Sequence, residues 1–73
     1  MDIEFTGYAV MRMHQRDILE DEVRETLATS PSKYRLRSDG RSEVRERIGR
    51  KLLLVVYVRR TEGITVVNAM WED

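Results

Sequence analysis

The segment KLLLVVYVR, residues 51–59, is an almost continuous apolar run that is rich in β-branched residues. Such side chains favour strands, and a strand that alternates apolar with polar residues buries only one face. A strand that is apolar at nearly every position is expected to be covered on both faces. We therefore predict that residues 51–59 form the central strand of a sheet.

The segments next to this run also have the two-residue period of strands. Residues 42–48 alternate, with Val44 and Ile48 on one side and Arg45 and Arg47 on the other. The sequence Asp-Gly within SDGR, residues 38–41, tolerates the positive φ of a tight hairpin turn. Gly-Arg before the central run and RTEG after it predict two further turns.

The part of the chain before Pro31 has a helical pattern. We predict a helix over 7–16, with Thr6 as its cap, because a threonine side chain can accept a backbone N–H at a helix start. A second helix is predicted over 18–28, with Asp17 and the glutamate three residues on as a capping box. Proline disfavours helix in the residue before it and ends this pattern.

These segments predict one α+β domain over residues 1–73. Two N-terminal helices pack on one face of a four-stranded, mainly antiparallel sheet. The expected strands cover residues 34–37, 42–48, 51–59 and 64–71.

Composition narrows the classes of function. The chain has no cysteine, its apolar runs are too short to span a bilayer, and its start lacks the pattern of a signal peptide, so we expect a cytoplasmic protein without membrane contact. No metal-ligand spacing or glycine-rich phosphate loop is present, so neither a metal nor a small-molecule cofactor is expected. The lone His14 has no placed carboxylate partner and is a poor candidate for catalysis.

The charges are segregated along the chain although the formal net charge is zero. Residues 1–30 carry three arginines against seven acids, a net of −4, and residues 61–73 add −3. Residues 31–60 carry ten basic residues against three acids, a net of +7. Such segregation can produce a dipolar surface, although each region could also be only a solvated face.

With both helices on one face, the other face of the sheet stays partly open. We expect Arg45 and Arg47 there, beside Tyr57 and Arg59 of the central strand. Arginine can hold phosphate with a bidentate fork, and a tyrosine ring can stack on a base, so this group would suit single-stranded RNA. The alternative is that Arg45 and Arg47 only keep a hairpin soluble and protect the sheet edge.

The first predicted helix carries a line of three side chains. Tyr8, Arg12 and Arg16 are four residues apart and lie along one side of the helix. They could extend the anion-binding surface, or the arginines could pair with acids of the second helix, such as Glu20 or Glu22.

The N-terminal segment FTGYAVMRMHQRDILEDEVRETLATSP resembles the start of a family of small bacterial proteins, the domain of unknown function 4258. The matching residues are Phe5, Thr6, Ala9, Arg12, Met13, Arg16 and Ile18, continued by Val23, Leu27 and Pro31. Further on, IGRKLLLVVYV resembles the glycine and apolar strand of that family. The family has a histidine at the position of Tyr8, which is the main departure.

That family is similar to the RelE, ParE and BrnT toxins, which are mostly ribonucleases or gyrase poisons neutralised by an antitoxin. The resemblance implies a toxin-like fold and an endoribonuclease of toxin–antitoxin type, with RNA and an antitoxin as partners. Under this hypothesis the catalytic residues are Arg47, Arg59 and Tyr57, and the RNA-binding residues are Arg45, Arg12, Arg16 and Tyr8.

The competing hypothesis is a non-enzymatic interaction module. In it, the acidic helices or the end of the chain near Trp71 would dock a protein partner or a second copy, as a homodimer. The other expectation for Trp71 is that it folds back over the small core, because a chain of this length buries only about 60% of its unfolded surface.

Overall fold

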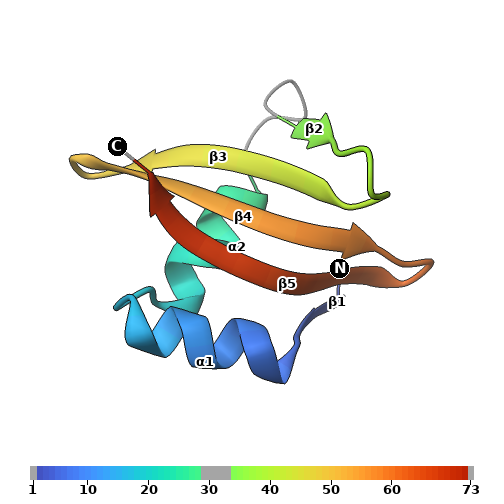
Figure 1. Cartoon of the computed structure of the whole chain (residues 1–73), viewed down its shortest axis with the longest axis horizontal. Coiled ribbons are helices and arrows are strands. Elements are labelled where there is room, and N and C mark those ends of the chain that lie inside the picture. The colour runs from blue at the N-terminus through green and yellow to red at the C-terminus, as the bar shows by residue number, and fades with distance from the viewer. Residues whose placement is uncertain (1, 29–33, 73) are drawn as a thin grey trace.

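A computed structural model describes residues 2–28 and 34–72, which fold as two helices and a twisted sheet (Figure 1). The helices are α1 (Gly7–Gln15) and α2 (Glu20–Leu27). The strands are β1 (Asp2–Phe5), β2 (Tyr34–Leu36), β3 (Ser42–Ile48), β4 (Lys51–Arg59) and β5 (Gly63–Glu72).

The prediction of a four-stranded, mainly antiparallel sheet is wrong. In the described residues the sheet has five strands in the order β1-β5-β4-β3-β2, and it is mixed because β1 runs parallel to β5. The additional strand precedes the first helix, so the chain does not begin with its two helices. The fold is an α+β domain whose first strand lies at one edge of the sheet, beside its last strand (Figure 1).

Strand β1 forms because its four residues alternate. Ile3 and Phe5 pack against the core, opposite Ile64 and Val66 of β5, whereas Asp2 is exposed. The short strand therefore adds two apolar side chains to a small core and covers the backbone edge of β5.

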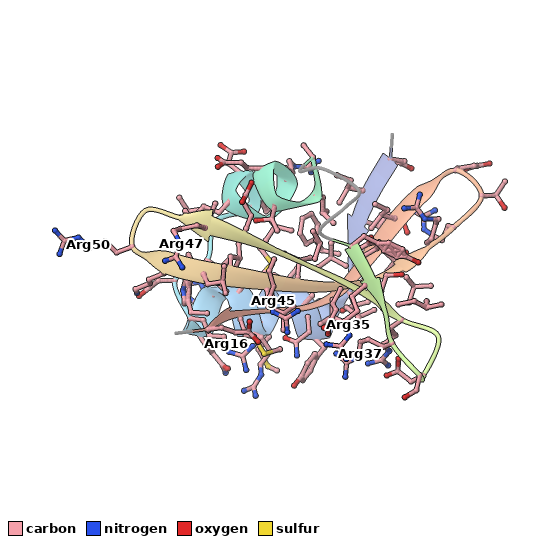
Figure 2. All side chains as sticks on the ribbon, turned by 90° about the horizontal axis from the view of Figure 1, so that it is seen from above. Arg16, Arg35, Arg37, Arg45, Arg47 and Arg50 are labelled. Atoms are coloured by element: carbon pink, nitrogen blue, oxygen red, sulfur yellow. The ribbon has the colours of Figure 1, made fainter. Side chains whose placement is uncertain are left out.

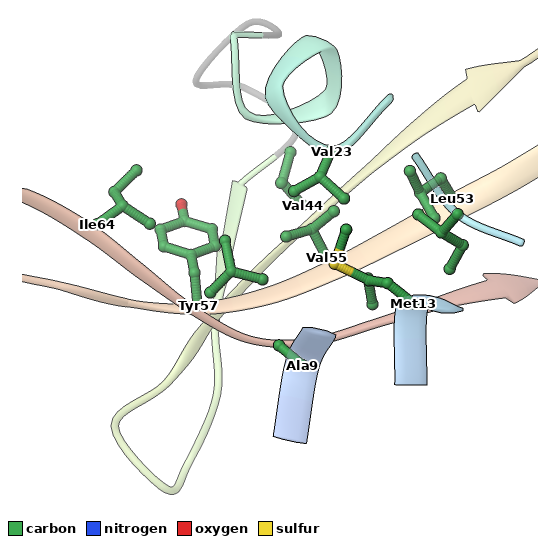
Figure 3. Close-up of a cluster of buried hydrophobic side chains, with 11 residues drawn as sticks. Ala9, Met13, Val23, Val44, Leu53, Val55, Tyr57 and Ile64 are labelled. Carbon is green, nitrogen blue, oxygen red and sulfur yellow. The ribbon is translucent and has the colours of Figure 1, made fainter. Parts of the chain in front are cut away.

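Both helices pack on the same face of the sheet. Ala9 and Met13 of α1 and Val23 of α2 meet Val55 of the central strand in one buried cluster (Figure 3). The predicted cap of α1 is confirmed, since the Thr6 hydroxyl oxygen accepts a hydrogen bond from the Ala9 N–H at 3.0 Å.

The predicted capping box of α2 is wrong. Asp17 adopts a left-handed conformation, with φ of 55°, just after α1 ends. The helix starts later, at Glu20, and the Glu22 carboxylate accepts the Leu19 N–H at 2.9 Å. The glutamate that supports this helix start, Glu22, therefore lies two residues further along than the predicted Glu20.

The hairpins set which side chains share a face. Arg37 and Arg41 are joined by a backbone hydrogen bond of 2.7 Å, so the first loop is the three residues 38–40, and Gly40 takes a φ of 86°. The second loop has only two residues, Gly49 and Arg50, because Ile48 pairs with Lys51. Three-residue loops of this kind end in a residue with positive φ, for which glycine is suited.

Candidate nucleic-acid interface

The face of the sheet away from the helices carries a row of arginines from the β2–β3 hairpin. Strand register pairs Arg35 with Glu43 and Arg37 with Arg41, and alternation along β3 then continues through Arg45 and Arg47. Their partners on β4, such as Leu54 opposite Arg45, also point away from the helices. We call the side chains of Arg35, Arg37, Arg41, Arg45 and Arg47 the arginine face; four of them are labelled in Figure 2.

A buried carboxylate organises the middle of the arginine face. The residue Glu43 is only 7% exposed, and its two oxygens lie 3.0 Å from Arg45 and 3.5 Å from Arg37. Arg45 also donates to both oxygens of Glu72, at 2.6 and 3.3 Å, across the intervening strand. Hydrogen bonds to Glu72 and then to Glu43 raise the pKa of the Arg45 guanidinium, because they favour its charged form.

Arg45 is therefore largely neutralised by its own chain. Its guanidinium makes three hydrogen bonds to two carboxylates and ties β3 to β5. Neither expected role of Arg45, holding an anion or only keeping the hairpin soluble, describes these contacts, since a bidentate arginine–carboxylate pair is a strong and specific interaction.

The remaining cations of the arginine face are more available. In residues 2–28 and 34–72, no carboxylate lies within ion-pair distance of the side chains of Arg35, Arg41 or Arg47. All three residues are exposed, and the Arg47 guanidinium donates a hydrogen bond to the Arg50 carbonyl oxygen at 3.5 Å. Within the part of the chain that the structure describes, these five arginine side chains pair with three carboxylates, Asp39, Glu43 and Glu72, and this set has a net charge of +2.

Tyr57 and Arg59 do not join the arginine face, contrary to the prediction. Tyr57 is opposite Ser42, is 4% exposed and lies in the core under the helices (Figure 3). Arg59 is opposite Ile64 and has the parity of Tyr57, so it lies on the helix side of the sheet, where it is exposed.

The reason is the two-residue loop between β3 and β4. Because Ile48 pairs with Lys51, every odd-numbered residue of β3 faces an even-numbered residue of β4. Arg45 and Arg47 are therefore opposite Leu54 and Leu52, and a predicted site that joined odd residues from both strands could not form.

The line of side chains on α1 is split between two tasks. The Arg12 guanidinium lies 5.5 Å from the centre of the Tyr8 ring and donates to the Gln15 amide oxygen at 3.2 Å. Arg16 donates to the Ala69 carbonyl at 2.7 Å and to the Asn68 side-chain oxygen at 3.1 Å, so it fastens α1 to β5. The expected pairing of these arginines with acids of the second helix is not the arrangement observed.

Trp71 completes this helix–sheet junction. Its indole N–H donates to the Arg16 carbonyl at 2.9 Å, and its ring packs against the core. It is half-buried and does not form a separate docking patch, in agreement with the expectation that it folds over the core.

Two hollows border the arginine face. One, of about 670 Å³, is lined by Arg35, Leu36, Arg37, Ser38 and Glu43. The other, of about 460 Å³, is lined by Thr6, Tyr8, Arg41, Val67 and Asn68. Arginines from the two strands of one hairpin thus reach two concave regions of the same surface.

The side chains suited to catalysis are not gathered at the arginine face. His14 is exposed on α1, and the described ranges 2–28 and 34–72 contain no cluster of three or more metal-ligating side chains. Within the same ranges, no helix is long and apolar enough to cross a membrane. The arginine face therefore offers binding groups, whereas the tyrosine that was assigned to catalysis is enclosed in the core.

Three arginines of this face, Arg35, Arg37 and Arg41, were missed by the sequence prediction. The alternation on both sides of the first turn could have indicated these arginines. Which residues of the two strands share a face, however, depends on the number of residues in the loop. The observed loop has three residues. A two-residue Asp-Gly loop would pair the two strands in a different register.

Comparison with known proteins gives no relative: no family model, no curated protein and no solved structure matches this chain.

Proposed function

We propose that this protein binds single-stranded RNA and holds the phosphate backbone on the arginine face. The observation that carries the proposal is the placement of five arginines from one hairpin on a single exposed face. Guanidinium groups bind phosphate oxygens through charge-assisted, often bidentate hydrogen bonds. Arg35, Arg41 and Arg47, which pair with no carboxylate among the described residues, would make most of these contacts.

The sheet offers a suitable shape for a single strand. The arginine face extends over two neighbouring strands, with the half-exposed ring of Tyr8 at its border with α1. Single-stranded binding sites combine a positively charged path for the backbone with aromatic side chains on which bases stack. The resemblance to the domain of unknown function 4258 family, and through it to toxins that cut RNA, supports the same class of ligand.

The proposal is binding and does not include cleavage. Cleavage of RNA needs a base that activates the 2′-hydroxyl, in reach of the group that stabilises the phosphorus centre. Tyr57 is in the core and Arg59 is on the other side of the sheet, so the proposed catalytic group of Arg47, Arg59 and Tyr57 is not assembled.

A homodimer through the arginine face is less favourable than an anion. Two copies would bring two surfaces of net charge +2 together, and juxtaposed like charges oppose association. The polyanionic backbone of RNA has the opposite sign and releases counterions when it binds.

The test is fluorescence anisotropy with a labelled 12-nucleotide RNA, using the wild type and the double variant Arg35→Ala/Arg47→Ala. The variant should bind more weakly, and its plot of log affinity against log salt should be shallower by about 0.7 for each lost phosphate contact. Arg59→Ala is the matched control, since Arg59 is an exposed arginine on the neighbouring strand but on the opposite face. Equal losses in both variants, or no binding by the wild type, would reject the proposal.

A further inference from the structure

The hollow between the start of α1 and the β5 bulge has features that the phosphate contacts do not use. It measures about 460 Å³, within the range of small-ligand sites, and is lined by Thr6, Tyr8, Arg41, Val67 and Asn68. Arg41 belongs to the arginine face, so the hollow is continuous with the proposed path of the backbone.

A β-bulge shapes one wall of the hollow. Val56 pairs with Asn68 and Tyr57 pairs with Val66, which leaves Val67 without a partner on β4. Bulges redirect side chains and occur often beside functional sites. Here the two residues of the bulge, Val67 and Asn68, supply an apolar and a polar group to the same hollow.

The Asn68 amide is oriented by two hydrogen bonds to its oxygen. That oxygen accepts from the Arg16 guanidinium at 3.1 Å and from the Ala69 N–H at 2.9 Å. Among residues 2–28 and 34–72 the NH₂ group of Asn68 has no hydrogen-bond partner, so its two hydrogens are available to a ligand. The guanidinium of Arg41 adds further donors, so the polar groups of the hollow select a ligand that presents acceptors.

The Tyr8 ring supplies the aromatic surface of the hollow. The tyrosine is 51% exposed; the Arg12 guanidinium lies 5.5 Å from the ring centre, and Arg12 is not one of the residues that line the hollow. About half of the tyrosine surface is therefore accessible to a flat group. An aromatic ring with hydrogen-bond donors nearby is the combination that holds an unstacked base.

We infer that this hollow is a nucleobase subsite, in which a base stacks on Tyr8 while its carbonyl oxygens accept hydrogen bonds from Asn68 and Arg41. Uracil and guanine carry such oxygens, and adenine carries none. The inference rests on the proposed binding of RNA and adds a contact to the base, whereas the arginine face contacts only the backbone.

The experiment compares two ligands of equal length and charge: a labelled 12-nucleotide uridine RNA and the same ribose–phosphate chain without bases. Wild-type protein should bind the uridine RNA more tightly. Tyr8→Ala should weaken binding of the uridine RNA by about 5- to 150-fold and leave binding of the base-free chain unchanged. Tyr8→Phe keeps the ring and should bind uridine RNA within about twofold of the wild type.

Tyr34→Ala is the control, because Tyr34 is also an exposed tyrosine but lies on the other face of the sheet, opposite Val44. Circular dichroism shows that each variant is folded before its affinity is compared. Two results would overturn the subsite: loss of binding to both ligands in Tyr8→Ala, or equal binding of the two ligands by the wild type. Neither result would overturn the proposal that the wild type binds the RNA backbone. No binding of either ligand by the wild type would overturn the proposed function and the subsite together.

Discussion

Glu43 holds the arginine face together through Arg37 and Arg45 and also lowers the net charge of that face. The carboxylate of Glu43 is almost fully covered and contacts two arginines, and Arg45 reaches over the central strand to Glu72. Removing one partner of such a group leaves charges without compensation. Stability and anion affinity should therefore respond in opposite directions to a change at Glu43.

Replacement of Glu43 with glutamine should lower the free energy of unfolding by about 1–2 kcal/mol. This is less than for a fully buried ion pair because the side chains of Arg37 and Arg45 remain 40% and 36% exposed. The same change raises the net charge of the face from +2 to +3, so RNA affinity should increase. Urea unfolding and fluorescence anisotropy measure the two effects, with Glu25→Gln on the exposed side of α2 as the control. A variant that loses both stability and affinity would contradict this account of Glu43.

Arg45 and Arg47 are two residues apart on the same face and should behave differently. Arg45→Met breaks the contacts with Glu43 and Glu72 and should cost about 1–2 kcal/mol of stability. Arg47→Met should leave stability within about 0.5 kcal/mol, since its side chain is exposed, but should weaken RNA binding. Thermal unfolding and anisotropy separate the two variants. Equal stability losses would show that Arg47 is also structural.

At the scale of elements, the β2–β3 hairpin and the added strand β1 have distinct tasks. The hairpin carries the arginine face, whereas β1 covers the opposite edge of the sheet and supplies Ile3 and Phe5 to the core. Pairing of β1 depends on Gly63, because a Cβ atom at this position would overlap the backbone carbonyl of Asp2. Gly63 is therefore required by the close approach of a neighbouring strand.

Replacement of Gly63 with alanine should displace the start of β1 and lower stability by about 1–3 kcal/mol, the usual range for overpacking. Hydrogen exchange should show faster exchange in Ile3–Phe5, while amides of the β3–β4 hairpin change little. Gly7→Ala is the matched control, since a Cβ there meets no atom within 4 Å and alanine favours the helix. Unchanged exchange in β1 would contradict the parallel pairing.

Across the whole molecule, the strand pattern was readable from sequence where each segment was long. The apolar run 51–59 is the central strand, and Leu53 to Tyr57 are all buried, as expected for a strand covered on both faces. Strand β1 was missed because four residues hold only two alternations, too few to separate a strand from a leading loop.

The candidate site was less predictable than the fold because it depends on loop lengths. The position of Arg45 and Arg47 on one face followed from alternation within a single strand. The neighbours of these arginines depended on pairing between strands, and a change of one residue in a loop exchanges the two faces of the next strand. That is why Tyr57 and Arg59 were predicted on the arginine face, while Arg35, Arg37 and Arg41 were overlooked.

The charge segregation seen in the sequence is also segregation in space. Five of the ten basic residues in 31–60 form the arginine face, while the acids of residues 20–25 lie on α2, behind the sheet (Figure 1). A molecule with zero net charge can therefore present a local positive surface to an anion.

The central claim is that RNA contacts the face of the sheet away from the helices. The most direct measurement is an NMR titration of the labelled protein with a 12-nucleotide RNA, following backbone amides and arginine Nε–H signals. The account predicts that the largest shifts occur at Arg35, Arg41 and Arg47, with little change at Arg59 or at the exposed α1 residues Val10 and Met11. Shifts concentrated at Val10 and Met11, away from Tyr8, or around Arg59 would contradict it.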